Sequence, residues 1–431
     1  MGPKLMSCSA VPRSPTLARA RLSSPALVAA LASLALLGIG GGCAATTSGQ
    51  GGAPLAPGPA AGDRASTSDP SGATSTDPSA WLDEAERALA SGELARAATL
   101  FARYLGHDGS GERGRQAYAG LARAHELLGD FDAAIRAYDG FLARFGDDPT
   151  AHLMLARRGA CEAQVLAWER SAASYAQVIE LGGDALIPSQ QVEALARQGF
   201  ALYQLGQLEQ ADAVLANADA IYEAATSAGQ ERFSDTYFVA MARFYRAAIL
   251  HLEFRKVRIR LPEAQMDADF EAKLALLERA QAAYNEVVRA RHVYWVSAAG
   301  YQLGSLFEEF YDAIMYAPVP DWLDDAQRRT YYLELEEQLR PVIDKAVWVF
   351  EKNLETARKL GYDNEFIELT QAQLGHLQGI VLGRGEGGGP MPRLAPRDPD
   401  DADSSDPSMP SPQDELPAVE RKLFVPMPTT L

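Results

Sequence analysis

The chain has 431 residues, of which 47 % are hydrophobic and 23 % charged, and its formal net charge is −17. Such an acidic chain is repelled by nucleic-acid phosphates, so we expect no nucleic-acid partner, and the acids help to keep a long chain soluble. Its cysteines, Cys8, Cys43 and Cys161, are too few for a disulfide framework or a cysteine-rich metal site.

Residues 1–43 have the parts of a bacterial export signal. Basic residues extend to Arg21, and an uncharged apolar run follows over residues 26–39. This run has the length of a signal-peptide core and is short for a membrane span. The segment ends in Gly40-Gly41-Gly42-Cys43, where small residues let the chain lie extended in a peptidase groove.

The end of this segment resembles the lipobox of bacterial lipoproteins. Gly41 and Gly42 fit that pattern, whereas Gly40 stands where the family usually has leucine. The resemblance implies that Cys43 is lipidated and becomes the new N-terminus, which anchors the chain in a membrane. By the family's sorting rule, Ala44 favours the periplasmic face of the outer membrane. An ordinary secreted or periplasmic protein and an uncleaved anchor remain as alternatives.

Two segments of low complexity flank the rest of the chain. Residues 44–79 are poor in large apolar side chains and cannot offset the entropy of ordering, so we expect a disordered linker. Coil scaling gives this linker a mean reach of about 30–36 Å. Residues 383–431 are expected to be a second low-complexity tail. Its apolar stretch 422–426 is a frayed end, a short docking peptide or a strand that packs back on the array.

Residues 80–230 contain four copies of a pattern of small residues. Two columns recur at a constant separation, and they hold Ala85, Ala122, Gly159 and Gly199, then Ala97, Ala134, Ser171 and Ala211. A third column holds Gly92, Gly129 and Gly206, with Leu166 in copy three. Helices pack closely where the side chains at a crossing are small, and a left-handed glycine ends the first helix. The pattern predicts helical hairpins whose crossings are surrounded by Trp81, Phe101, Tyr118, Tyr138, Leu155, Tyr175 and Leu215.

This pattern resembles the tetratricopeptide repeat (TPR) family. In copy two the signature positions hold Tyr118, Leu121, Ala122, Gly129, Ala134 and Tyr138, while His125 and Phe141 depart from the family. The resemblance implies an all-α, TPR-like solenoid whose inner face is lined by first helices and binds peptides. It places the partner-binding groove at Gln116, Arg123, Glu126, Gln164, Glu193, Phe200, Tyr203 and Gln204. Phe200 and Tyr203 are either aromatic anchors for a peptide or packing residues against the next repeat.

Residues 231–382 are predicted to be degenerate helical repeats and capping helices. Apolar helical segments cover 233–257, 270–290 and 294–315, and Pro318-Val319-Pro320 breaks the chain. Helices are expected over 321–361, with a new helix starting at Pro341, and over 364–382. Residues 318–374 resemble TPR proteins of the envelope gliding machinery in social gliding bacteria.

The sequence contains no convincing catalytic or metal-binding pattern. The histidines lack the spacing of a zinc helix, and the G-x-G-x-x-G match at 383–388 follows a helix instead of a strand. Neighbours such as Glu308-Glu309 and Asp324-Asp325 diverge by about 100° on a helix, so we expect them on solvated faces or at helix N-termini. Cys161 is expected to be an inert core thiol. We therefore expect no enzyme, no cofactor and no metal.

These features favour a non-catalytic protein–protein interaction scaffold, lipid-anchored in the bacterial cell envelope. It would organise a multiprotein complex, such as one for gliding motility or secretion. The alternative is a periplasmic chaperone or assembly factor for outer-membrane proteins. The expected partners are envelope proteins or peptides in the groove and the membrane through the lipid anchor, with no small-molecule substrate.

Overall fold

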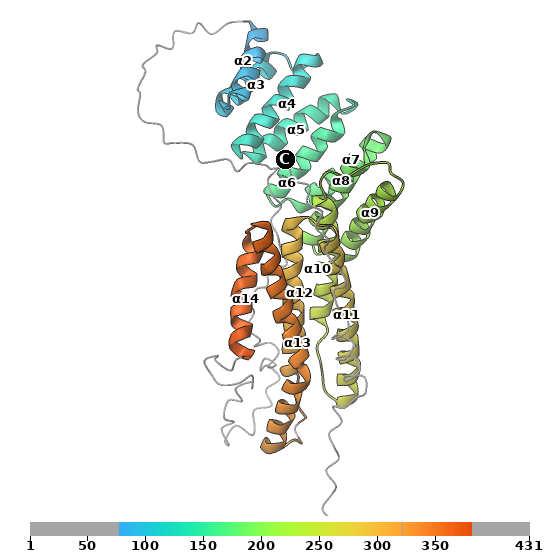
Figure 1. Ribbon diagram of the computed structural model, residues 1–431. Coiled ribbons are helices and arrows are strands. Elements are labelled where there is room, and N and C mark those ends of the chain that lie inside the picture. Colours follow the sequence, from blue (N-terminus) through green and yellow to red (C-terminus); the bar gives the residue numbers. More distant parts are fainter. Residues whose placement is uncertain (1–76, 321, 382–431) are drawn as a thin grey trace, which may run out of the picture.

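A computed structural model of the protein describes residues 77–320 and 322–381 (Figure 1). The predictions on the export signal, on the lipidation of Cys43, on most of the linker 44–79 and on the tail 383–431 lie outside the described residues. Within these residues all regular secondary structure is helical, which confirms the predicted all-α class.

The first half of the described chain is a stack of antiparallel helical hairpins. The helices are α2 (Pro78–Ala90), α3 (Leu94–His107), α4 (Gly111–Leu128), α5 (Phe131–Phe145), α6 (Ala151–Gln164), α7 (Trp168–Gly182), a short 3-10 helix η1 (Gly183–Ala185), α8 (Pro188–Gln204) and α9 (Leu208–Ser227). Each first helix packs on its second helix, and each second helix packs on the first helix of the next copy. Figure 1 shows this stack from blue to green.

Every hairpin turns in the same way. At the turn of copy two, the N–H of Gly129 donates to the carbonyl of Glu126 at 3.0 Å, and the N–H of Asp130 donates to the carbonyl of His125 at 2.9 Å. Both bonds satisfy carbonyls that the end of α4 leaves without helical partners. The same pair of bonds recurs at Gly92, Leu166 and Gly206. All of these turn residues have positive φ, including Leu166 at +59°, so the turn geometry does not depend on glycine.

The predicted columns of small residues meet at the helix crossings. Six of their members have no exposed surface: Ala85, Ala97, Ala122, Ala134, Ser171 and Ala211. The Ser171 hydroxyl donates to the carbonyl of Gly159 at 2.8 Å, which joins the two columns directly. Phe101, Tyr138, Leu155, Tyr175 and Leu215 are buried around the crossings as predicted, whereas Trp81 and Tyr118 are only partly buried.

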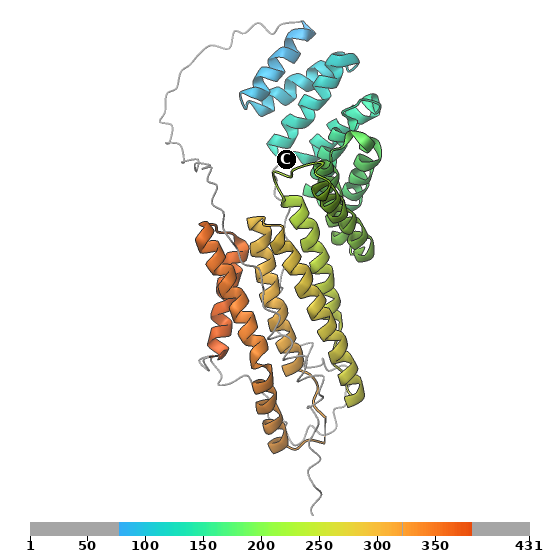
Figure 2. The same cartoon turned by 45° about the vertical axis from the view of Figure 1, so that its right-hand side comes forward.

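The second half is a bundle of longer helices that continues below the stack (Figure 2). They are α10 (Tyr237–Lys256), α11 (Glu263–Arg289), α12 (Val293–Met315), α13 (Asp325–Leu360) and α14 (Glu365–Val381). The central helix α12 contacts the other four. Small residues again mark a crossing, because a Cβ atom at Gly304 would lie 2.3 Å from the ring of Phe350 on α13.

Pro341 does not begin a helix, and this prediction was wrong. It lies inside α13, a single helix of 36 residues. Pro341 is on the exposed side of α13, so water can bind the Glu337 carbonyl that loses its helical donor. Buried residues on both sides of it, Leu339 and Val342 among them, hold the two parts of the helix in the same core.

Candidate protein-binding surface

The first-helix residues of copy two divide into an exposed part and a buried part. Gln116 is exposed, and its amide donates to Glu112 at 3.2 Å. The Arg123 side chain is 37 % exposed, whereas that of Glu126 is only 4 % exposed. We therefore expect Gln116 and Arg123, but not Glu126, to be accessible to a partner.

Glu126 instead connects copies two and three. Its carboxylate accepts hydrogen bonds from the hydroxyl of Tyr138 at 2.7 Å, from Arg157 at 2.9 Å and from Arg123 at 3.2 Å. A buried charge that is paired and hydrogen-bonded in this way holds its neighbours in fixed positions, and it is costly to break. The role that the structure gives to Glu126 is therefore structural, contrary to our prediction of a groove contact.

A similar polar link continues through copy three. Arg158 pairs with Asp139 of copy two at 3.0 Å, and the hydroxyl of Ser174 donates to the buried Glu162 at 2.6 Å. Gln164, the predicted groove residue of this copy, is half buried. Polar side chains therefore connect copies two and three across their contact.

Copy four does not offer the aromatic anchors that the sequence suggested. Phe200 has no exposed surface, and its ring centroid lies 5.4 Å from that of Trp168 and 4.8 Å from that of Tyr245. Tyr203 also packs on Tyr245, at 5.0 Å, and burial raises the pKa of Tyr203 to about 12. The reason is that α10 packs against α8 as well as α9 and covers this face.

Phe200 therefore packs against the neighbouring helices, which was the second of the two roles that we considered for it. The prediction that it anchors a peptide was wrong. Tyr203 and Gln204 are half buried at the edge of the same contact. The side chain of Glu193 is 43 % exposed and pairs with Arg197 at 3.0 Å. Among the eight predicted groove residues, the accessible ones are chiefly Gln116, Arg123 and Glu193.

Sequence reasoning missed a buried polar cluster in the second half. His251 on α10 has no exposed surface. Its Nε2 lies 3.2 Å from Glu309 on α12, and its Nδ1 lies 3.2 Å from the hydroxyl of Tyr284 on α11. Arg255 donates two hydrogen bonds to the same Glu309 carboxylate, at 2.8 and 2.7 Å. The cluster thus connects α10, α11 and α12, and the i, i+4 spacing of His251 and Arg255 was its only signal in the sequence.

The acidic pairs are only partly as predicted. Burial alone would raise the pKa of Glu309, but His251 and Arg255 hold it well below its usual value. Glu308 points elsewhere and accepts from Gln373 on α14 at 2.5 Å. The two carboxylates do diverge, but Glu308 is buried and the Glu309 side chain is only 14 % exposed, contrary to the solvated face that we predicted. Asp324 is the N-cap of α13, in agreement with the prediction of a helix N-terminus.

Lys273 is a second buried cation near this cluster. Its ammonium donates to the carbonyls of Phe254 and Val257 at 2.9 Å each, and these carbonyls end α10. Burial lowers the pKa of Lys273 to about 8. A cation at a helix C-terminus is favourable, so Lys273 acts as a cap supplied by the neighbouring helix α11.

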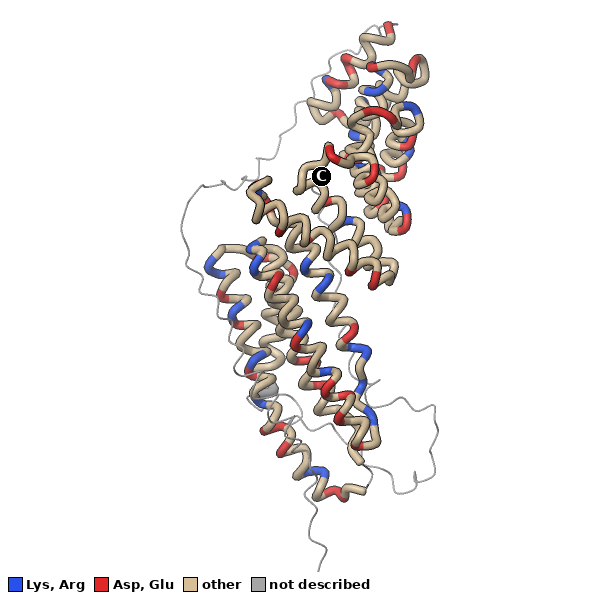
Figure 3. The backbone as a smooth tube through the Cα atoms, turned by 90° about the vertical axis from the view of Figure 1, so that its right-hand side faces the viewer, with Lys and Arg blue, Asp and Glu red and all other residues tan. Residues whose placement is uncertain are grey.

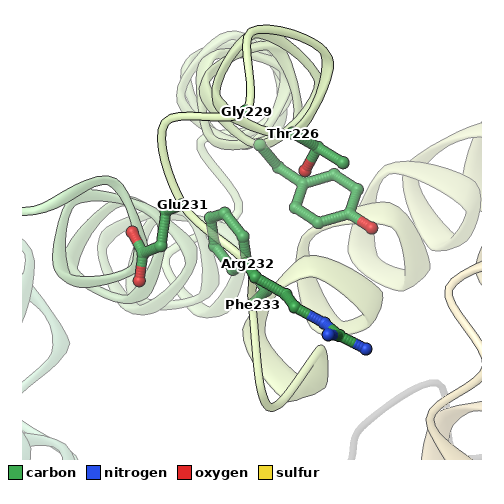
Figure 4. A pocket seen from close by; sticks show the side chains of 6 residues that line it. Thr226, Gly229, Glu231, Arg232 and Phe233 are labelled. Carbon is green, nitrogen blue, oxygen red and sulfur yellow. The ribbon is translucent and has the colours of Figure 1, made fainter.

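A shallow pocket of about 270 Å³ lies where the stack joins the bundle. It is lined by Tyr222, Thr226, Gly229, Glu231, Arg232 and Phe233. Figure 4 shows the side chains of Glu231 and Arg232 pointing in different directions. Glu231 accepts a hydrogen bond from the N–H of Ser189 at 2.9 Å, which attaches the loop to the start of α8. The pocket walls therefore help to join the two halves of the chain.

The described residues offer little else that points to chemistry. Cys161 is buried, and burial raises the pKa of its thiol to about 12, which keeps it protonated. In residues 77–320 and 322–381, no three His, Cys, Asp or Glu side chains are grouped so that they could hold a metal ion. None of the described helices is long and apolar enough to span a membrane. Acidic and basic residues are interspersed over both halves (Figure 3).

Comparisons with known proteins agree with the repeat pattern. The family model of the tetratricopeptide repeat matches residues 115–158, which are copy two and the start of copy three. A comparison with the curated proteins found no match.

Several solved structures match the chain at low sequence identity. Pseudomonas aeruginosa pilF is 15 % identical, with 60 % of this chain and 90 % of that chain covered and a TM-score of 0.33. A tetratricopeptide repeat protein from Parabacteroides merdae is 12 % identical, with 70 % and 98 % covered and a TM-score of 0.32. The apo form of RapI is 11 % identical, with 64 % and 99 % covered and a TM-score of 0.37.

The family match falls on the copy in which the hairpin turn, the small-residue crossing and the buried aromatic residues all follow the repeat pattern. The same turn and crossing recur in the copies on either side. Residues 115–158 thus match the tetratricopeptide repeat, and the copies on either side continue its hairpin geometry into a helical array, a fold that supports protein–protein interaction.

Proposed function

We propose that the protein is a non-catalytic interaction scaffold, lipid-anchored at the periplasmic face of the bacterial outer membrane, and that it organises a multiprotein envelope complex. The observation that carries this proposal is the stack of hairpins with an exposed polar first-helix surface at Gln116 and Arg123. The lipobox-like sequence before Cys43 and the following linker support the anchor. The resemblance of residues 318–374 to gliding-machinery proteins favours a motility complex over secretion.

Mass spectrometry of the mature N-terminus tests the anchor. We expect a chain that begins at an acylated Cys43 and fractionates with the outer membrane in a bacterial host. The matched variant Cys43→Ser should remain unprocessed. A wild-type chain cleaved at another residue, with Cys43 unmodified, would rule out the lipid anchor.

A pull-down from cross-linked membranes tests the scaffold. The double variant Gln116→Ala/Arg123→Ala should lose a defined set of envelope proteins that the wild type recovers. Glu126 keeps its hydrogen bonds from Tyr138 and Arg157 when Arg123 is removed, so we expect the double variant to remain folded, which a thermal melt checks. The control is Arg136→Ala, an exposed arginine on the second helix α5. Equal recovery by all variants would exclude the first-helix surface, and binding of many unrelated unfolded peptides would favour the chaperone instead.

A further inference from the structure

The turns that join first to second helices lie together on one edge of the stack. Because neighbouring helices are antiparallel, all of these turns fall on the same side. The contacts agree, since Val165 at the turn of copy three packs in the same cluster as Phe131 at the turn of copy two. We call this side the turn edge, and we define it by Leu127, Leu128 and Leu166 together with Asp132, Glu169 and Glu209.

Leu166 is the unusual residue of the turn edge. Leu166 is 66 % exposed, and its φ of +59° is unfavourable for leucine. Copies one, two and four hold glycine at this position and form the same two hydrogen bonds. The fold therefore requires the left-handed backbone but not the leucine side chain. Because the leucine side chain does not contribute to the turn itself, it is available for a contact outside the chain.

The preceding turn along the same edge also has exposed leucines. Leu127 and Leu128, which end α4, are 48 % and 45 % exposed. Leu128 directly precedes Gly129, as Val165 directly precedes Leu166. The leucines of copies two and three thus extend along the same edge, on adjacent turns.

A row of carboxylates borders these leucines. Asp132, Glu169 and Glu209 lie in the first turns of α5, α7 and α9, and all three are exposed. None of them forms an ion pair with a described residue. Acids in a first turn also favour the helix itself. Here they leave uncompensated negative charge beside the apolar surface, and this charge selects among possible partners.

We propose that the turn edge binds a segment of a partner protein that carries apolar side chains flanked by lysine or arginine. The apolar side chains would cover Leu166, Leu127 and Leu128, and the basic side chains would pair with the row of carboxylates. The same carboxylates repel an anionic lipid surface and the turn edge of a second copy. This surface adjoins the first-helix surface at Gln116 and Arg123, because Leu127 follows Arg123 by one turn of α4, but it is centred on the turns. The inference rests on the proposed function in needing a protein partner.

Leu166→Gly is the decisive variant because it removes the side chain without disturbing the turn. Glycine is the residue of the other copies and has no penalty at positive φ, so the variant should fold at least as well as the wild type. The matched control is Leu181→Ala, which truncates a leucine of similar exposure, 57 %, at the opposite end of its hairpin. The probe is a synthetic helical peptide with a leucine stripe and lysine elsewhere, together with versions that carry glutamate for lysine or a scrambled order.

We expect the leucine–lysine peptide to bind the full chain and Leu181→Ala alike, by fluorescence anisotropy. Leu166→Gly should weaken this binding by about tenfold, the factor for a leucine side chain left uncovered. The triple variant Asp132→Asn/Glu169→Gln/Glu209→Gln should bind more weakly and with less dependence on salt. The glutamate and scrambled peptides should bind poorly.

Equal binding of the leucine–lysine peptide by Leu166→Gly and wild type would overturn the inference. So would equal binding of the lysine and glutamate peptides, or self-association of the chain that Leu166→Gly abolishes. The membrane pull-down separates this inference from the proposed function. If Gln116→Ala/Arg123→Ala loses partners while Leu166→Gly retains them, the scaffold stands and the turn edge is not its contact.

Discussion

Replacing Gly199 by alanine tests how closely the helices cross in copy four. In an ordinary helix interior this change stabilises by about 1 kcal/mol, because alanine is the better helix former. At Gly199, however, the new Cβ atom would lie 2.4 Å from Cγ of Leu215, against about 3.5–4.0 Å for a normal carbon–carbon contact. Leu215 has no exposed surface and must shift within the core, which typically costs about 1–3 kcal/mol.

We therefore expect Gly199→Ala to destabilise the chain by about 1 kcal/mol. The same change at Gly375 should stabilise by about 1 kcal/mol, because no atom lies within 4 Å of the new Cβ on the exposed side of α14. Gly159→Ala should fall between them, since its Cβ would lie 3.1 Å from that of Ser174. The change in unfolding free energy should therefore follow the distance from the new Cβ atom to its nearest neighbour.

Hydrogen exchange with peptide resolution is the suitable assay. A repeat array need not unfold in one step, so local opening free energies are more informative than a single midpoint. We expect faster exchange in α8 and α9 for Gly199→Ala, and slower exchange in α14 for Gly375→Ala. If Gly199→Ala slowed exchange as Gly375→Ala does, the close crossing of α8 and α9 would be refuted.

Three further changes have expected signs. Leu166→Gly should raise the unfolding free energy by about 0.5–1 kcal/mol in urea melts, because glycine has no left-handed penalty and loses only part of that gain to chain entropy. Pro341→Ala should slow exchange in the middle of α13 and stabilise by about 1–3 kcal/mol, since it restores a donor to the carbonyl of Glu337. Lys273 has a folded pKa of about 8, below its unfolded value of about 10.4, so the unfolded chain binds more protons between these values. Relative to Lys273→Met, the wild type should therefore gain about 2 kcal/mol from pH 8 to pH 10 in paired melts, and parallel curves would contradict the buried cation.

The hairpin stack could be predicted because its determinants are local and periodic. Small residues at Ala122 and Ala134 mark one crossing, and Gly129 marks the turn between them, so three positions define each hairpin. Leu166 shows where this reasoning reaches its limit. The sequence indicated that copy three lacked the turn glycine, but only the structure showed that leucine adopts the same left-handed backbone.

The candidate site was harder to predict because burial depends on distant helices. Phe200 has the periodicity of a groove residue, yet Tyr245 on α10, outside its own hairpin, covers it. Glu126 likewise appeared to be a surface residue until Arg157 of the next copy was placed beside it. Local spacing identifies which face of a helix a residue occupies, but not which other helix covers that face.

The two halves of the chain differ in what they leave available to a partner. In the bundle, α12 contacts α10, α11, α13 and α14, and its polar side chains Glu308 and Glu309 bond to those neighbours. Each bundle helix therefore turns much of its surface toward another helix. In the stack, by contrast, each hairpin contacts chiefly its neighbours in the chain, which leaves both the first-helix surface and the turn edge open. Since binding requires accessible side chains, we expect the partner to bind the stack. The bundle packs on the last hairpin of the stack, α8 and α9, and stabilises that end.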